Sequence, residues 1–293
     1  KTYVDPAVNW KYKSEPEEAL AGRSGYWPRG KVVGGSGAIN ALVYARGLPK
    51  DFDDWATAGA AGWDWETVRR TYEAMETRLG INGERQGGGP LHVQDVSDQI
   101  HPVNQHFFAA AKELGMPRTQ NINGSACEGA GVYRINTSGG RRMHSARAFL
   151  KPALKRANVT LMTGVLAEQI IFEGTRAVAV QVVRNGNTQT LRAGREIIVS
   201  SGAISSPRLL QLSGVGPAEL LKSHGITPLQ DAPHVGGNLQ DHLGINYYFR
   251  ATEPTLNNVL RPFTGKVRAA LQYALTRRGP LALSVNQCGG YFR

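Results

Sequence analysis

The sequence predicts an α/β fold (α+β mixed), in which helices and strands share one chain. Residues 159–192 hold several short apolar runs typical of strands, and Asn185-Gly186 stands between two of them, a strong short-range signal for a β-hairpin. Residues 195–202 are a further apolar run that ends in glycine, as expected of a buried strand entering a turn. Residues 64–75 instead place apolar side chains three and four positions apart, the spacing of an amphipathic helix.

Residues that cap helices or interrupt regular structure divide the first half of the chain into elements. Asp64 is a favoured N-cap residue ahead of the helical spacing. Three glycines at 87–89 break the chain before a short apolar strand. The elements predicted here are a small-residue helical start at 36–45, a helix after Asp64, a strand at 91–93, a helix from Pro102 to Leu114 and a short helix at 146–154.

The second half predicts a strand-rich region followed by helices. Glu173-Gly174 and Asn185-Gly186 are turns between strands, and the prolines Pro207 and Pro217 suit the first position of a helix. The elements predicted here are strands at 159–162, 169–172, 177–183, 188–191 and 195–202, helices at 207–212 and 217–223, a strand at 245–249 and a basic helix at 266–278.

The composition narrows the classes of function. A hydrophobic content of 41% and a charged content of 19% are ordinary for a globular protein. The formal net charge of +11 fits a solvated basic surface, and also fits attraction of anionic cofactor phosphates or a basic face that meets another chain. The sequence has no Lys/Arg run of the kind that marks nucleic-acid binding, so we expect no nucleic-acid partner.

Cysteines, histidines and apolar stretches give further expectations. Cys127 and Cys288 lie far apart and predict free thiols in a reducing compartment rather than a disulfide framework. The seven histidines show no metal-ligand spacing, and we expect no metal site. No apolar stretch approaches the roughly 18 residues of a membrane span, and the first residues do not read as a signal peptide, so we expect a cytoplasmic protein.

Two glycine-rich segments carry the functional signal. Residues 30–40 read Gly-Lys-Val-Val-Gly-Gly-Ser-Gly-Ala-Ile-Asn and lead into Tyr-Ala-Arg-Gly at 44–47, and residues 202–216 read Gly-Ala-Ile-Ser-Ser-Pro-Arg-Leu-Leu-Gln-Leu-Ser-Gly-Val-Gly. Glycine lets a flat or anionic group approach the backbone, although each segment alone is more often a tight connection without a ligand. With Gly-Gly-Asn-Leu-Gln-Asp-His at 236–242, they resemble the signatures of the glucose–methanol–choline (GMC) family of FAD-dependent oxidoreductases, choline-dehydrogenase-like branch.

The resemblance implies a set of residues that contact FAD. In that family the first segment passes along the pyrophosphate, the ribityl chain and the isoalloxazine ring. The corresponding residues here are Gly34 and Gly35 for close backbone approach, Ser36 and Asn40 for polar contacts, and the backbone of Ala41, Leu42 and Val43 beside the ring.

The resemblance also extends to the second segment and to the mode of attachment. Gly202 and Ala203 are expected near the ADP half of FAD, and Ala167 is expected to read the adenine edge with its backbone. Some relatives carry a histidine that bonds covalently to the flavin just before the asparagine. This chain has Ile39 there, so we expect non-covalent FAD.

The same resemblance implies a domain division and a partial chain. It implies an incomplete, Rossmann-like FAD-binding domain and a substrate-binding domain built on a mixed or antiparallel sheet. The segments expected are 1–90 (FAD-binding, with the flavin-contacting loop), 91–155 (substrate domain, partly helical), 156–242 (FAD-binding, with the second signature) and 243–293 (start of the substrate-binding domain, truncated). Neither the family's N-terminal GxGxxG unit nor its C-terminal catalytic histidine is present, so we expect a fragment and assign no catalytic residue.

The implied function is FAD-dependent oxidation of a primary alcohol by hydride transfer to flavin N5, as in a GMC-type alcohol or choline dehydrogenase or oxidase. The partner is then a small alcohol. Its identity, choline included, is left open, as is the electron acceptor, oxygen or a quinone-like carrier. Two alternatives stand beside this function: a non-redox relative, either a lyase or a photodecarboxylase, and a non-catalytic fragment.

Overall fold

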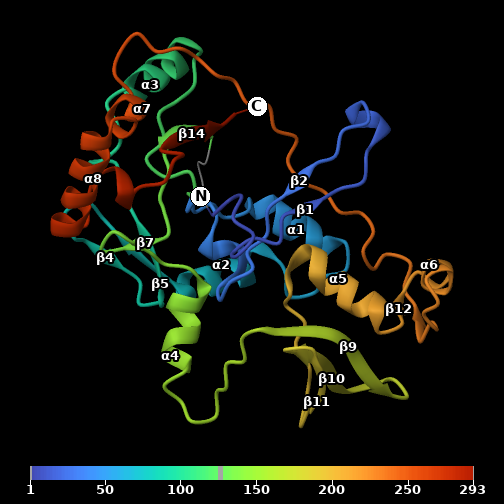
Figure 1. Cartoon of the computed structure of the whole chain (residues 1–293). Coiled ribbons are helices and arrows are strands. Elements are labelled where there is room, and N and C mark those ends of the chain that lie inside the picture. The colour runs from blue at the N-terminus through green and yellow to red at the C-terminus, as the bar shows by residue number, and fades with distance from the viewer. Residues whose placement is uncertain (1, 125–127, 293) are drawn as a thin grey trace. The chain divides into compact units, whose positions relative to one another are not determined.

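The computed structural model describes residues 2–124 and 128–292, and the chain divides into two compact units (Figure 1). Residues 1–159 and 249–293 form one unit, which we call the loop unit, and residues 160–248 form the other, the hairpin unit. The four-segment domain division expected from the sequence stays a prediction, and Cys127 lies outside the described residues.

The hairpin unit is built on an antiparallel three-stranded sheet in the order β11-β10-β9. Asn185 and Gly186, with φ of 51° and 80°, form the two-residue turn between β10 and β11, which confirms the predicted hairpin. The Ser213 hydroxyl accepts from the Ile170 amide at 2.8 Å and donates to the Leu209 carbonyl at 2.6 Å, which ties α5 to β9. The elements are β9 (Val165–Glu173), β10 (Arg176–Arg184), β11 (Asn187–Arg192), α5 (Gly202–Leu212), β12 (Val215–Gly216), α6 (Ala218–Ser223) and β13 (Gln230–Asp231).

Three predicted strands are wrong. Residues 159–162, 195–202 and 245–249 form no strand in the structure, and Ile198 in the second run is 78% exposed. An apolar run becomes a strand only where a neighbouring strand takes its backbone N–H and C=O groups, and none of the described strands lies beside these runs.

The helix of the second glycine segment also differs from the prediction. It begins at Gly202 rather than at Pro207, which lies inside α5. Gly202 has a φ of 89°, so the chain turns into the helix five residues earlier than the proline suggests.

The loop unit combines short strand pairs with peripheral helices. Strand β3 pairs in parallel with β5 and antiparallel with β4, and β6 pairs antiparallel with β14. Asp64 accepts from the Thr67 amide at 3.0 Å, which confirms it as the N-cap of α2. The elements are β1 (Tyr12–Lys13), β2 (Tyr26–Trp27), α1 (Pro49–Thr57), α2 (Trp65–Met75), β3 (Glu76–Leu79), β4 (Arg85–Gln86), β5 (Leu91–Gln94), α3 (Asn104–Glu113), β6 (Gly129–Val132), β7 (Thr137–Ser138), β8 (Arg141–Arg142), α4 (Lys151–Ala153), α7 (Leu256–Leu260), α8 (Phe263–Thr276) and β14 (Cys288–Tyr291).

Single turns complete the loop unit: the 3₁₀ turns η1 (Glu18–Leu20), η2 (Gly35–Ala38) and η4 (Pro280–Ala282), and the π turn η3 (Ala146–Leu150). The helical start predicted at 36–45 is therefore confined to η2. The helical conformation does not continue, because the Asn40 side-chain oxygen accepts a hydrogen bond from the Leu42 backbone N–H at 3.0 Å and Leu42 adopts a left-handed φ of 70°.

A small apolar core includes Leu42, which follows this turn in the chain. Leu42, Val96 and Ile135 form a buried cluster with Leu283 packed against it. Ile135 bridges two segments, because its backbone exchanges hydrogen bonds with Gln94 at 2.8 and 3.1 Å and pairs with Val43. The core thus holds the residues that follow the first glycine segment.

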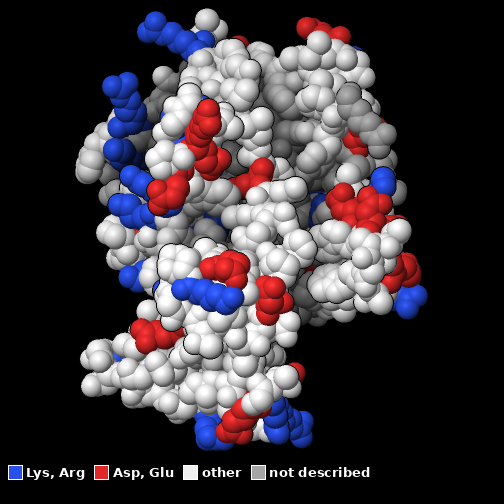
Figure 2. Space-filling model, turned by 90° about the vertical axis from the view of Figure 1, so that its right-hand side faces the viewer, with Lys and Arg blue, Asp and Glu red and all other residues white. Residues whose placement is uncertain are grey.

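None of the described helices combines the length and the apolar character that crossing a bilayer requires. On the face drawn in Figure 2, acidic and basic side chains lie interspersed among wide uncharged areas rather than in one continuous basic field.

Candidate functional site

The first glycine segment forms a tight loop that exposes its backbone on one side. Gly34 and Gly35 have φ of 98° and 58°, a left-handed conformation that favours glycine, and η2 starts directly after Gly34. A Cβ atom placed on Gly35 would meet no atom within 4 Å. The chain itself therefore leaves the space over Gly35 open.

The loop is closed at its base by Ser36. The Ser36 hydroxyl accepts from the Gly30 amide at 3.1 Å, and a Cβ on Gly30 would lie 2.2 Å from the Gly35 carbonyl oxygen. The Asn40 amide donates back to the Ser36 carbonyl at 2.9 Å. Ser36, which the sequence suggests as a cofactor contact, thus also fixes the shape of the loop.

Arg142 holds the far end of the loop. Its guanidinium donates to the Asn40 side-chain oxygen and to the Asn40 carbonyl, both at 2.7 Å, and to the Gly37 carbonyl at 3.2 Å. Burial lowers the pKa of Arg142. Sequence reasoning did not single out Arg142 as a site residue, because it is 102 positions from Asn40 and only the fold brings the two together.

Residues 41–43 leave one set of backbone groups unused. The Leu42 carbonyl accepts from the Asn136 amide at 3.0 Å, and the Ala41 carbonyl accepts from the Ser284 hydroxyl. Val43 faces Ile135, and the backbone hydrogen bonds on either side of this pair run from the Asn136 N–H to the Leu42 carbonyl and from the Tyr44 N–H to the Arg134 carbonyl. Among residues 41–43, Val43 is the residue whose backbone N–H and C=O both lack a hydrogen-bond partner among the described residues.

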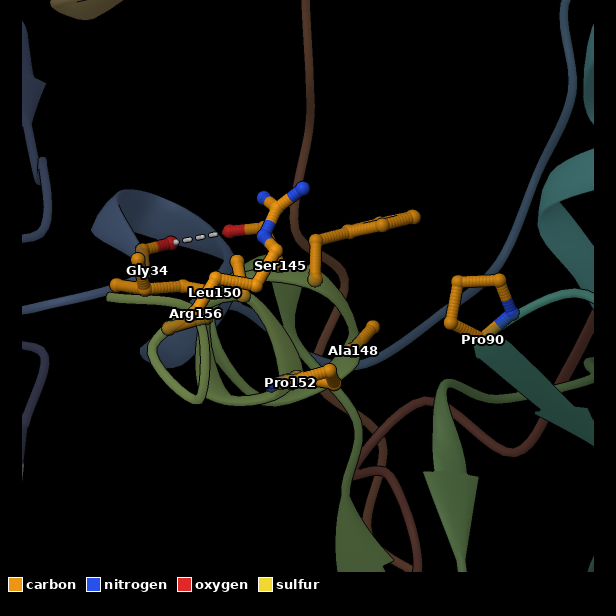
Figure 3. Close-up of a pocket in the computed structure, with 10 residues that line it drawn as sticks. Gly34, Pro90, Ser145, Ala148, Leu150, Pro152 and Arg156 are labelled. Carbon is orange, nitrogen blue, oxygen red and sulfur yellow. Dashed lines mark hydrogen bonds between the residues drawn. The ribbon is translucent and has the colours of Figure 1, made fainter. Parts of the chain in front are cut away.

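A hollow of about 790 Å³ opens beside the loop, as Figure 3 shows. Gly34 forms one wall, and the Ser145 hydroxyl lies 3.4 Å from the Gly34 carbonyl. The other walls come mainly from η3 and α4, and the full lining is Gly34, Pro90, Ser145, Ala146, Ala148, Phe149, Leu150, Pro152, Ala153 and Arg156. Most of these walls are apolar, with one arginine among them.

His144 borders this loop with a polar atom that has no partner. Its Nδ1 is buried and makes no hydrogen bond among the described residues, and it lies 2.4 Å from where a Cβ on Gly34 would stand. Burial, with Arg142 and Arg147 nearby, lowers the pKa of His144. Its imidazole is therefore neutral near pH 7 and can donate or accept one further hydrogen bond.

The segment that contains Arg142 and His144 is rich in basic residues. Seven basic residues and no acidic residue lie between Glu128 and Glu168. Arg142, Arg147 and Arg156 from this stretch border the loop, His144 or the hollow. Such a concentration of positive charge attracts an anionic group such as a pyrophosphate.

A buried ion pair fixes the segment that follows the loop. Glu76, at the start of β3 and 2% exposed, accepts from Arg46 Nε at 2.9 Å, from Arg46 Nη2 and from the Tyr44 hydroxyl. Burial opposes the charge of Arg46, but the Glu76 carboxylate outweighs it and raises the pKa of Arg46. Burial, reinforced by the hydrogen bond to Glu76, raises the pKa of Tyr44.

The second group of predicted site residues lies in the hairpin unit. Ala167 on β9 pairs with Val182, next to a register shift that leaves Glu168 without a partner on β10. Gly202 opens α5 with nothing within 4 Å of its Cβ position, and Ala203 follows it in the first turn. These three residues belong to a different unit from Gly34–Val43, and each group is placed within its own unit.

Other reactive side chains form no further centre. Among residues 2–124 and 128–292, no group of three or more His, Cys, Asp or Glu side chains could hold a metal ion. Cys288 is a free thiol whose Sγ contacts Asn104 Oδ1 at 3.0 Å, and burial raises its pKa.

Comparison with known proteins places this loop in a family. Residues 17–244 match the profile of GMC oxidoreductases, and this span includes both glycine segments. The chain belongs to the GMC oxidoreductase family. It is 43% identical over 272 residues to an oxygen-dependent choline dehydrogenase of Rhizobium johnstonii, covering 92% of this chain and 49% of that protein. It is 39% identical over 291 residues to the mitochondrial choline dehydrogenase of Mus musculus, covering 99% and 48%.

Solved structures show the same fold in other GMC oxidoreductases. A formate oxidase variant from Aspergillus oryzae superposes with a TM-score of 0.89 at 27% identity, covering 98% of this chain and 52% of that chain. A pyridoxine 4-oxidase from Mesorbium loti superposes with a TM-score of 0.72 at 33% identity, covering 77% of this chain and 45% of that chain. The chain thus spans about half the length of the relatives it matches.

The raised pKa of Tyr44 predicts an alkaline loss of stability. Because Tyr44 keeps its proton in the folded chain beyond the ordinary value of 10.0, the free energy of unfolding falls as pH rises above 10. We expect Tyr44→Phe to lower stability by about 1–3 kcal/mol at pH 7 through the lost bond to Glu76. Above pH 10 the variant should lose stability less steeply than the parent, by up to about 1.4 kcal/mol per pH unit.

Urea unfolding between pH 7 and 11 measures both effects. Tyr3→Phe, which changes an exposed tyrosine, is the matched control. Parallel pH profiles for the Tyr44→Phe variant and the parent would contradict the placement of a half-buried, protonated phenol beside Glu76.

Proposed function

We propose that this chain builds the FAD-contacting loop of a GMC-type enzyme that oxidises a primary alcohol. The observation that carries the proposal is the Gly34–Val43 loop. Its backbone is open over Gly35, its neighbour His144 has a buried polar atom without a partner, and an apolar hollow adjoins it. These features fit a cofactor with a flat ring and an anionic diphosphate.

The residues that would hold FAD divide by the kind of contact they offer. Gly34 and Gly35 let the cofactor approach the backbone, and Asn40, oriented by Arg142, offers its side-chain amide. Val43 offers a free N–H and C=O beside the ring position. The remaining proposed contacts are Ser36, Ala41, Leu42, Ala167, Gly202 and Ala203. Bound FAD supplies the acceptor for the hydride that leaves the alcohol carbon.

The chain's own contribution to the reaction is placement and electrostatics. Arg142 and Asn40 fix the loop before the cofactor arrives, which lowers the entropy that binding costs. The basic stretch between Glu128 and Glu168 favours the negative charge of the diphosphate. We assign no general base within this chain, because none of its histidines matches the family's catalytic histidine.

The substrate class proposed is a small primary alcohol, choline being the alcohol in the names of the curated relatives. We further propose that residues 1–90 and 156–242 belong to the FAD-binding domain, and that residues 91–155 and 243–293 belong to the substrate-binding domain.

Gly35→Val tests the placement of the loop. A side chain at Gly35 meets nothing in the chain, so its effect on FAD binding reports what occupies that space. We expect FAD affinity, measured by quenching of flavin fluorescence, to fall at least roughly tenfold because the branched side chain blocks the cofactor.

Gly22→Val is the matched control for this substitution. Gly22 also has a positive φ, 73°, and an open Cβ position, so it shares the backbone strain of the change but lies outside the loop. Equal FAD affinity in the two variants would place the cofactor elsewhere.

Ile39 leads us to propose non-covalent attachment, since its side chain offers no nucleophilic atom to the flavin. Precipitation of the FAD-loaded protein with acid should release all of the flavin into the supernatant. Yellow colour that remains with the washed polypeptide would contradict the proposal. A protein covalently flavinylated through histidine, treated in the same way, is the control.

Reduction by alcohols tests the reaction. The purified protein is incubated with FAD, desalted and mixed anaerobically with choline or a simple primary alcohol. We expect loss of the flavin absorbance near 450 nm, about the usual position for an oxidised flavin, when the chain is part of a protein that also carries the family's catalytic histidine, and we expect the chain alone to be inactive. A flavin spectrum that no alcohol bleaches in the histidine-containing protein would favour a non-redox relative, and a colourless desalted protein would favour a non-catalytic fragment.

A further inference from the structure

A second hollow, of about 400 Å³, opens in the loop unit and shares no lining residue with the hollow beside Gly34. It lies where three segments meet: the end of β5, the loop that follows α3, and the chain at the end of β6. The lining is Asp95, Ser97, Arg118, Thr119, Gln120, Val132 and Arg134. Every lining residue except Val132 has a polar side chain, and two are arginines. This hollow is therefore polar, unlike the mostly apolar one beside the glycine loop.

Arg134 is held in place by its backbone. Its carbonyl accepts from the Tyr44 amide at 2.9 Å, and the next residue, Ile135, is 1% exposed in the apolar core. The Arg134 side chain has an Nε atom that is buried and makes no hydrogen bond among the described residues. A guanidinium stays charged in proteins, and a buried polar atom of this kind is rarely left without a partner. The unpartnered group indicates an acceptor that the chain itself does not supply.

The two carboxylates that share a hollow or crevice with Arg134 are engaged elsewhere. Asp95 lines the same hollow, and its side chain accepts from the backbone amide two residues further along at 2.9 Å. Glu76 lines a crevice of about 10 Å³ that also borders Arg134, and it already forms the buried ion pair described above. In the part of the chain that the structure describes, neither Arg134 nor Arg118 takes part in an ion pair. The hollow thus contains two cationic side chains and one anionic side chain that are not paired with one another.

Arg118 is oriented by an aromatic ring. The central carbon of its guanidinium lies 3.2 Å from the centre of the Phe108 ring. Stacking on a ring fixes the plane of a guanidinium and leaves the N–H donors at its edge available to an acceptor. Arg118 is exposed whereas Arg134 is half-buried, so the hollow presents one cation near its mouth and one deeper inside.

This arrangement selects a small organic anion. The planar fork of N–H donors on an arginine matches the oxygens of a carboxylate or a phosphate group, which it can bind through two parallel hydrogen bonds. The net positive charge of the lining favours such a group, and the Asp95 carboxylate favours a ligand that also carries an O–H donor. The volume lies within the ordinary range of small-molecule pockets and exceeds what a bare ion would fill.

We propose that this hollow binds a small hydroxylated carboxylate or phosphate through Arg118 and Arg134. Arg134 donates from within the hollow, and Arg118 donates from its mouth. The Ser97 hydroxyl and the Gln120 amide offer further hydrogen bonds to the polar remainder of the ligand. The inference rests on this hollow alone and depends neither on FAD nor on the proposed reaction.

Isothermal titration calorimetry of the purified protein tests the proposal. The probes are malate and glycerol 3-phosphate, with sodium chloride at matched ionic strength as the control for unspecific charge effects. We expect at least one probe to bind one site per chain with a Kd of about 1 mM or tighter, and sodium chloride to give no saturable signal. Binding of malate alone assigns the carboxylate as the recognised group, and binding of glycerol 3-phosphate alone assigns the phosphate. Saturable binding by neither probe overturns the proposal.

Substitutions of the two arginines locate the bound probe. Arg118→Gln should weaken binding at least roughly tenfold, because it removes a charge and a fork of donors from an exposed position. Arg134→Lys keeps the charge but loses the fork, and should weaken binding by a smaller factor. Arg261→Gln, which changes an exposed arginine outside the hollow, is the matched control and should bind like the parent. Unchanged circular dichroism shows that each variant is folded.

Two further outcomes would contradict the site. Equal affinity of the Arg118→Gln variant and the parent for the probe would place the bound anion elsewhere and overturn the proposal. Displacement of the probe by FAD would assign the hollow to the cofactor and overturn it as well. Failure of the protein to bind FAD leaves the probe titrations unaffected, so the two proposals fail separately.

Discussion

The buried pair of Arg46 and Glu76 is the constraint on which the loop unit depends. A carboxylate that is 2% exposed is tolerated only when it is paired and hydrogen-bonded, and Glu76 meets this condition through Arg46 and Tyr44. Glu76 opens β3, whereas Arg46 and Tyr44 close the segment that follows the glycine loop. The pair therefore fixes the end of the loop segment relative to β3. Strand β3 in turn pairs in parallel with β5. At the end of β5, Gln94 bonds Ile135, which faces Val43.

The entrance of the loop is fixed by an independent set of contacts. The Ser36 hydroxyl accepts a hydrogen bond from the Gly30 amide at the base of the loop. Arg142, on a strand about a hundred residues further along the chain, donates hydrogen bonds to Asn40. With both ends held, the backbone between them keeps its left-handed turn without contribution from a ligand. The strain at Leu42, whose φ is 70°, is offset because its side chain lies in the core with Val96 and Ile135. A preformed loop of this kind binds a rigid cofactor at a lower entropic cost than a flexible one.

Sequence reasoning succeeded where the signal is local and failed where it depends on partners. The Asn185-Gly186 turn and the Asp64 cap are short-range signals, and the structure confirms both. The family was also recognisable from the two glycine segments, and the profile match confirms it. The run 195–202 is as apolar as a strand, but no described strand pairs with it, and periodicity cannot report the absence of a partner. Sequence reasoning did not identify the roles of Arg142, His144 and Glu76, because these roles arise from contacts between distant segments. The role of each predicted FAD contact stays a prediction.

The positive charge is distributed unevenly along the sequence. Residues 129–167 and 254–293 together carry thirteen basic residues and no acidic one, whereas the whole chain has a net charge of +11. The rest of the chain is therefore slightly acidic, and many of its charges neutralise one another in pairs within α1, α2 and α6. The first basic stretch includes Arg142, which bonds the glycine loop, and the second contains α8. Positive charge beside the glycine loop agrees with the cofactor diphosphate proposed there.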